Sequence, residues 1–130
     1  MSQADPDPAR FRELMLDDEP AFEDVLSCVF GIQDHESRTY LVLLEHPGST
    51  VAELAEVLDR DRSNVNRSLT TLMEKGLADR QRRLLDPGGY VYQYTATELP
   101  EAKEMLHTAL DQWAETVHGR IEEFGDGDGL

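Results

Sequence analysis

Residues 49–76 have the sequence STVAELAEVLDRDRSNVNRSLTTLMEKG, and this stretch decides the fold. Apolar residues recur at spacings of three and four over 51–58 and again over 62–75, which predicts two short amphipathic helices. Only residues 59–61 connect them. Two helices joined by so tight a connection are typical of a helix-turn-helix.

Capping signals mark the ends of both helices. Glu53 follows Thr50 by three residues, which is the spacing of a capping box. Asp61 is placed to cap the second helix, and Gly76 ends it directly after a cation. The boundaries are therefore predicted independently of the apolar pattern.

The apolar period changes from 3.6 to 2 after Gly76. Residues 77–85 and 90–95 flank the turn-forming sequence DPGG, which predicts a β-hairpin. A long helix then follows over 99–124. Helix-turn-helix and hairpin in this order predict a mainly α-helical winged helix-turn-helix, with the hairpin as its wing and a long C-terminal helix for dimerisation.

The N-terminal part adds two further helices, which we expect over 22–32 and 34–44, the second capped by Asp34. At 130 residues the chain has the size of one domain. The expected organisation has four parts: a disordered segment or short arm or helix over 1–19, a winged-helix domain over 20–97, a dimerisation helix over 98–124 and a disordered tail over 125–130.

Three segments carry a resemblance to a known family: STVAELAEVL (49–58), RSNVNRSL (62–69) and LMEKGLA (72–78). Together they resemble the MarR and TrmB-like archaeal winged-helix transcription regulators over residues 32–95. The resemblance implies a DNA-binding transcription regulator. Full-length TrmB-like proteins also carry a large C-terminal sugar-binding domain, for which 130 residues leave no room, so sugar sensing of that kind is not expected.

The overall charge is strongly negative: 27 acidic residues stand against 12 basic ones, for a formal net charge of −15. Ten of the basic residues are arginine and two are lysine. Dense surface carboxylates with little lysine resemble the proteins of halophilic archaea, and we take the acidity as a sign of that environment. The alternatives are that the acidity relates to an acidic substrate or that the protein mimics DNA.

The positive charge is concentrated in residues 60–83, which we call the basic segment. It holds seven of the twelve cations and three acids, so it carries +4 while the remainder carries −19. Such a cluster is typical of a nucleic-acid contact surface. Chance clustering of arginines is the alternative.

The second helix of the helix-turn-helix supports a DNA contact. If its apolar side chains face the core, the opposite stripe holds hydrogen-bonding groups and no acid. We predict base contacts from Asn64, Asn66 and Arg67, and phosphate contacts from Ser63, Thr70, Arg60 and Arg62. From the wing we predict backbone or minor-groove contacts by Arg80, Arg82 and Arg83, with a salt bridge to the acidic body as the alternative for Arg83.

The long last helix carries an apolar stripe too wide for so small a body to cover. A second copy would cover it, and a two-fold dimer would place two wings on half-sites about one DNA turn apart in a near-palindrome. The predicted dimer interface, to which residues 10–30 could add, consists of Leu106, Leu110, Trp113, Val117, Ile121 and Phe124.

The remaining chemistry is sparse, and we expect no enzyme, cofactor, metal site or membrane partner. The single cysteine, Cys28, has no internal partner and is interpreted as a buried, inert thiol, with a redox sensor as the alternative. The four histidines lack metal-ligand spacing and are interpreted as solvated or capping residues.

The alternating tyrosines Tyr90, Tyr92 and Tyr94 are interpreted as core packing, with base stacking as the alternative. No secretory or membrane-spanning segment is evident, so we expect the cytoplasm.

A competing hypothesis keeps the fold and changes the partner. The winged helix would dock another protein, and the negative charge would keep it off DNA. Carboxylates interrupting the basic segment would favour this interaction module, whereas a continuous positive surface would favour DNA. The sequence names no small-molecule effector.

Overall fold

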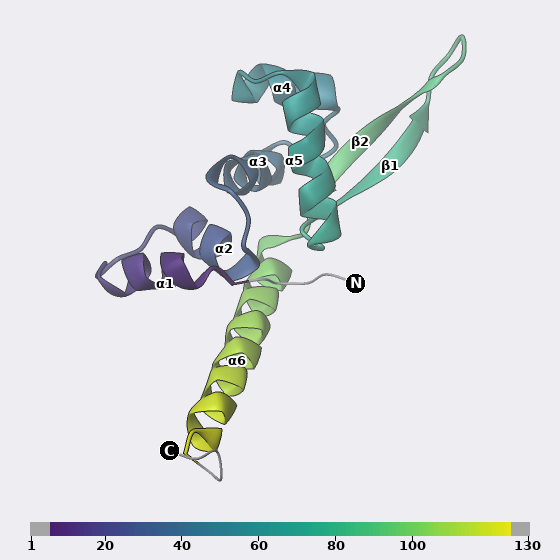
Figure 1. Cartoon of the computed structure of the whole chain (residues 1–130). Helices are drawn as coiled ribbons and strands as arrows, with labels where there is room; N and C mark the ends of the chain where they lie inside the picture. The colour runs from purple at the N-terminus through teal and green to yellow at the C-terminus, as the bar shows by residue number, and fades with distance from the viewer. Residues whose placement is uncertain (1–5, 126–130) are drawn as a thin grey trace.

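The computed structural model describes residues 6–125, and our expectations for residues 1–5 and 126–130 lie outside that range. The elements follow the chain as α1 (Pro8–Met15), α2 (Phe22–Phe30), α3 (Asp34–Glu45), α4 (Val51–Leu58), α5 (Arg62–Glu74), β1 (Ala78–Leu84), β2 (Tyr90–Ala96) and α6 (Leu99–Glu123). Helices α3, α4 and α5 pack together as the body (Figure 1). The β1–β2 hairpin extends from one side of this body, and α6 leaves it as a long rod with α1 and α2 beside its beginning (Figure 1).

This arrangement confirms the predicted winged helix-turn-helix with a hairpin wing and a long C-terminal helix. The expected arm or short helix near residue 10 is the helix α1. None of the helices within residues 6–125 combines the length and the apolar character needed to cross a membrane.

The predicted capping box at the start of α4 is present. The backbone N–H of Glu53 donates to the Thr50 hydroxyl at 3.2 Å, and the backbone N–H of Thr50 donates to the Glu53 carboxylate at 2.8 Å. These bonds satisfy two groups that a helix start otherwise leaves unpaired. Asp61 occupies the N-cap position of α5, but its side chain makes no capping bond.

The start of α3 differs from the prediction by one residue. Gln33 rather than Asp34 is the N-cap, and its backbone N–H donates to the Glu36 carboxylate at 2.8 Å. Asp34 lies in the first helical turn, where a negative charge still interacts favourably with the helix dipole. Its carboxylate binds the Arg10 guanidinium of α1 at 3.0 Å instead of capping its own helix.

The core lies where the faces of α2 to α5 and the first turns of α6 meet the base of the wing. The α5 stripe behaves as its periodicity predicts, because Val65, Leu69 and Leu72 are fully buried. Burying each such side chain stabilises the folded state by about 1.5–3 kcal/mol relative to leaving it exposed. Their burial fixes which residues α5 turns outward.

The wing is anchored at its base and exposed at its tip. Tyr94 is 1% exposed, and its backbone exchanges 2.8 Å hydrogen bonds with Gly48 and Ser49, in the loop before α4. From Asp79 onward β1 is exposed. The hairpin therefore extends from the body as a two-stranded antiparallel ribbon.

Helix α1 packs on α6 through a stack of two aromatic rings. The ring centroids of Phe11 and Trp113 lie 4.7 Å apart with the planes at 5°. Trp113 is thus half-buried by its own chain, and Leu106 is 8% exposed within the core. Both were predicted for a dimer interface, and Leu106 is already covered within one copy.

Candidate nucleic-acid interface

The outer face of α5 presents the polar stripe that the sequence predicts. Ser63, Asn66, Arg67 and Thr70 are exposed and Asn64 is half-buried. Glu74, at the last position, is the one acidic residue among the described positions of α5. The face therefore offers donors and acceptors without a repelling carboxylate near its centre.

Two predicted base-contact residues already interact on this face. The Arg67 guanidinium donates to the side-chain oxygen of Asn64, one turn earlier. This bond leaves the other guanidinium N–H groups and the Asn64 amide N–H groups available. Arg67 and Asn64 can therefore present one connected set of donors to a base edge.

A hydrogen-bonded cluster lies behind that face, and the role of its central residue, His35, was not predicted from the sequence. His35 Nδ1 lies 3.1 Å from the Ser68 hydroxyl and 3.3 Å from the Arg60 guanidinium, and Arg60 also donates to Ser68 at 3.3 Å. His35 Nε2 lies 2.7 Å from the Gln33 side-chain oxygen. Because Gln33 offers an acceptor there, we assign the proton to Nε2, which leaves Nδ1 to accept from Ser68 and Arg60.

The interpretation of His35 as a solvated or capping residue is therefore wrong. Ser68 carried the available signal: it falls between Val65 and Leu72 on the buried stripe, where a hydroxyl needs a partner. Which residue supplies that partner depends on how α3 crosses α5. Arg60, predicted as a phosphate contact, is half-buried and held by this cluster at the edge of the α5 face.

The wing brings arginines and tyrosines together on one face. Arg80 and Arg82 pair across the strands with Tyr94 and Tyr92, whereas Arg83 pairs with Val91 on the opposite face, as alternation predicts. A hydrogen bond to the Tyr94 hydroxyl, at 3.4 Å, raises the pKa of Arg80, so this side chain stays charged.

The core-packing interpretation of Tyr90, Tyr92 and Tyr94 holds for Tyr94 and Tyr92 but not for Tyr90. Tyr94 belongs to the core, Tyr92 is half-buried and Tyr90 is 50% exposed. The reason is that the hairpin leaves the body, so later positions on the same face lose their covering elements. The rings of Tyr92 and Tyr90 also contact arginines.

The cations of the basic segment form no salt bridge with the acidic body in the described part of the chain. Salt bridges within residues 6–125 join Arg10 to Asp24 and Asp34, and Arg120 to Glu123. Across that range, no cation of the basic segment takes part in one, so the salt bridge considered for Arg83 is not formed. Asp61 and Asp79 border the surface without pairing to its arginines.

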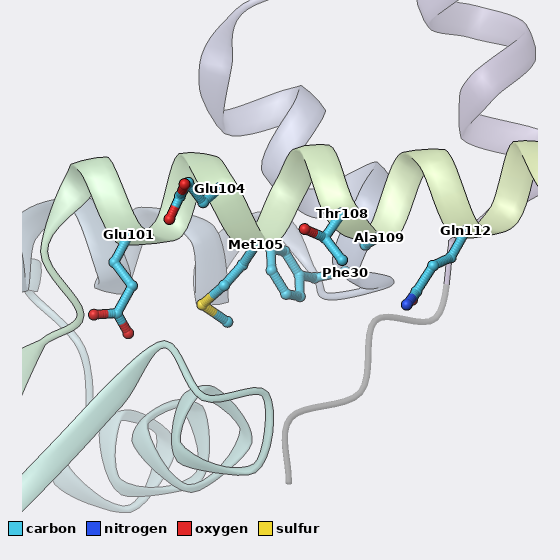
Figure 2. A pocket seen from close by; sticks show the side chains of 7 residues that line it. All are labelled: Phe30, Glu101, Glu104, Met105, Thr108, Ala109 and Gln112. Carbon is cyan, nitrogen blue, oxygen red and sulfur yellow. The ribbon is translucent and has the colours of Figure 1, made fainter.

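A separate pocket of about 310 Å³ lies along α6, away from this surface. Figure 2 shows Phe30 and Met105 converging on its apolar side, with Glu101 at one end and Gln112 at the other. The part of the chain that the structure describes has no cluster of three or more histidine, cysteine, aspartate or glutamate residues able to hold a metal.

Cys28 is fully buried, which fits the interpretation of an inert thiol. Burial raises the pKa of the thiol above its ordinary value, so the reactive thiolate is disfavoured.

Comparisons with known proteins agree with this architecture. The family model described as sugar-specific transcriptional regulator TrmB matches residues 26–99. The protein MJ1082 of Methanocaldococcus jannaschii is 39% identical over 95 residues, which cover 73% of this chain and 78% of MJ1082.

Two solved structures share the fold. A possible transcriptional regulator from Methanosarcina mazei Go1 has a TM-score of 0.74 at 26% identity, over 80% of this chain and 88% of that one. FabT of Streptococcus pneumoniae, solved in complex with DNA, has a TM-score of 0.50 at 22% identity, over 92% of this chain and 85% of FabT. The resemblance found in the sequence is confirmed, and the chain belongs to the TrmB family of transcriptional regulators, which are not enzymes.

Proposed function

We propose that this chain regulates transcription by binding double-stranded DNA as a homodimer at a near-palindromic promoter site. One observation carries the proposal: the outer face of α5, whose one acid, Glu74, lies at its end, adjoins wing arginines that form no salt bridge with a described carboxylate, in a chain of net charge −15. A surface that stays positive while the rest is acidic fits a polyanionic partner. The FabT complex with DNA supports the choice of partner through the shared fold.

The residue roles follow from position on this surface. Exposed side chains at the centre of the α5 face suit base edges, so Asn66 and Arg67, with Asn64 bonded to Arg67, are assigned to the major groove. Side chains at the edges suit phosphates. These are Ser63, Thr70, Arg60 and Arg62. The wing lies beside α5 (Figure 1), so its arginines Arg80, Arg82 and Arg83, on β1, are assigned to the neighbouring backbone and minor groove.

The proposed dimer uses the part of α6 that leaves the body. Leu110, Ile121 and Phe124 are 38%, 60% and 73% exposed, and Val117 is half-buried. Large apolar side chains along a projecting rod favour a second copy as their cover. With Trp113 stacked on Phe11, α1 would border the same interface.

We further propose that the protein acts in the cytoplasm of a halophilic archaeon. The surplus of carboxylates and the preference for arginine over lysine support this environment. In strong salt, the release of counterions from DNA contributes little to the free energy of binding. Hydrogen bonds to bases and the recognition of DNA shape must then supply more of the affinity. Binding should then tolerate salt better than that of a typical basic repressor.

The experiment that tests the function is selection of binding sites by the full chain from randomised DNA duplexes. Each duplex should be long enough for two half-sites about one helical turn apart. Enrichment of an inverted repeat supports the proposal. Failure to enrich any sequence at any salt concentration contradicts it and favours the interaction module.

A salt titration on the enriched duplex separates the halophile proposal from the DNA proposal. The affinity should fall only shallowly between moderate and molar KCl. A steep fall would contradict the adaptation to strong salt while leaving specific binding intact.

A further inference from the structure

Two tyrosines of the wing, the half-buried Tyr92 and the exposed Tyr90, lie directly against its arginines. The Cζ atom of Arg80 lies 3.8 Å from the ring centroid of Tyr92, and that of Arg82 lies 5.2 Å from the centroid of Tyr90. The rings of Tyr90 and Tyr92 meet edge to face, with their centroids 5.4 Å apart. These four residues form a chain of contacts in the order Arg80, Tyr92, Tyr90 and Arg82, which we call the Arg–Tyr ladder.

The ladder is diagonal to the strand register. Arg80 faces Tyr94 across the hairpin and Arg82 faces Tyr92, yet each guanidinium lies over the tyrosine one step closer to the tip. Diagonal neighbours on one face are within reach of aromatic and long side chains. Both arginines therefore lean in the same direction, and Arg80 is also held by the Tyr94 hydroxyl.

Core packing does not explain the outer part of the ladder. Tyr90 is 50% exposed, at the far end of the ribbon from the body. In that place its ring contacts Arg82 and Tyr92.

We propose that Tyr90 and Tyr92 are positioning residues that hold Arg82 and Arg80 ready for the DNA backbone. This inference rests on the proposed function. When the flat face of a guanidinium lies on an aromatic ring, the arginine side chain has fewer conformations available to it. The N–H groups at the edge of the guanidinium remain free to bind a phosphate. An arginine ordered before binding loses less side-chain freedom when the contact forms.

The same geometry accounts for arginine at these two positions. The planar guanidinium stacks on a ring, whereas a lysine ammonium is a compact point charge on a flexible stem. Arg83, on the opposite face beside Val91, has no such ring across the strand. We therefore expect the arginines on the tyrosine face of the wing to be ordered before DNA binds, and Arg83 on the other face to be more mobile.

The test compares wing variants of the full chain on the enriched duplex. Tyr90→Thr removes the ring and keeps a strand-favouring residue, and we expect binding to weaken about two- to fivefold, the range of an exposed cation–π contact. Tyr90→Phe keeps the ring and should bind like wild type. Val91→Thr, a change of similar shape on the opposite face, is the matched control.

A double-mutant cycle distinguishes positioning from direct contact. If Tyr90 acts through Arg82, then Tyr90→Thr should have no further effect in an Arg82→Ala background. An equal loss in both backgrounds would mean that the ring itself contacts DNA, and would overturn the inference. Wild-type affinity of Tyr90→Thr would overturn it as well.

A measurement without DNA checks the ladder itself. The side-chain methylene protons of Arg80 and Arg82 should show upfield ring-current shifts in NMR spectra, and Tyr92→Thr and Tyr90→Thr should abolish them. Absence of these shifts in wild type would overturn the ladder while leaving the proposed function untouched. If the ring-current shifts are present but the chain binds no DNA, the proposed function has failed and the role of the ladder falls with it.

Discussion

His35 Nδ1 lies 3.1 Å from the buried hydroxyl of Ser68, and this contact joins the first turn of α3 to the inner face of α5 across 33 positions of the chain. The outer face of the same helix carries the proposed base contacts. The orientation of that face is therefore set by a polar cluster as well as by the apolar stripe.

We expect His35→Ala to lower the free energy of unfolding by about 1–2 kcal/mol, because the Ser68 hydroxyl loses one of its two partners in a buried place. Specific DNA binding should weaken too, since Arg60 loses the acceptor that holds it. Denaturant unfolding and binding to the enriched duplex measure the two effects. His107→Ala, at an exposed position of α6, is the control and should change neither.

Replacing Arg67 by alanine should weaken specific DNA binding by roughly 1–3 kcal/mol and relax the sequence preference at one position of the half-site. Arg67 is exposed at the centre of the α5 face. Arg38→Ala removes the same charge from an exposed position of α3 outside the basic segment and is the matched control. Equal affinities of wild type and Arg67→Ala for the enriched site would remove Arg67 from the base contacts.

Tyr40→Phe should change how stability depends on pH. The buried Tyr40 hydroxyl donates to the backbone oxygen of Thr97 at 2.7 Å, and burial, with the nearby Glu101 charge, raises its pKa to about 12. A raised folded-state pKa favours the protonated form. The resulting stability is complete below the unfolded pKa of about 10 and is lost as the pH rises through the folded value.

At neutral pH the Tyr40→Phe variant should therefore be about 1 kcal/mol less stable than wild type, from the lost hydrogen bond. The difference should shrink as the pH rises above about 10. Urea unfolding over a pH series measures it, with Tyr90→Phe as the control at an exposed tyrosine. A difference that stays constant up to the highest pH would contradict the raised pKa of Tyr40.

The thiol of Cys28 should resist labelling by a disulfide reagent in the folded protein. It is fully buried, with a raised pKa, and its Sγ lies 3.7 Å from the backbone oxygen of Asp7. Labelling should follow unfolding as urea is added. An oxidant should leave DNA affinity unchanged in wild type; a loss that is absent in Cys28→Ser would instead support the redox alternative.

Ile121→Glu should dissociate the proposed dimer without unfolding the protomer. Ile121 is 60% exposed in a single copy, so a carboxylate there costs little in the monomer but is buried at a dimer interface. Light scattering in molar KCl measures the mass of wild type and variant. His118→Glu, at an exposed polar position of α6, is the control. A monomeric wild type would contradict the dimer.

Local patterns predicted most of the secondary structure. The helices of the helix-turn-helix, the capping box at Thr50 and Glu53, and the hairpin around DPGG all depend on residues within a few positions of one another. The capping assignment failed by one position at Asp34, because that carboxylate binds Arg10 from a different helix. A partner 24 positions away has no local signature.

The sequence by itself determined the winged-helix topology, the buried stripe of α5 and the absence of acids from the centre of its outer face, because helical and strand periods are local properties of the chain. Tertiary structure alone decided which polar groups meet. It placed His35 against Ser68, set Trp113 on Phe11 and left Tyr90 beside Arg82 outside the core. These contacts depend on the angles at which the helices cross and on where the wing leaves the body. The periodicity of the sequence determines neither those angles nor which side chains other elements cover.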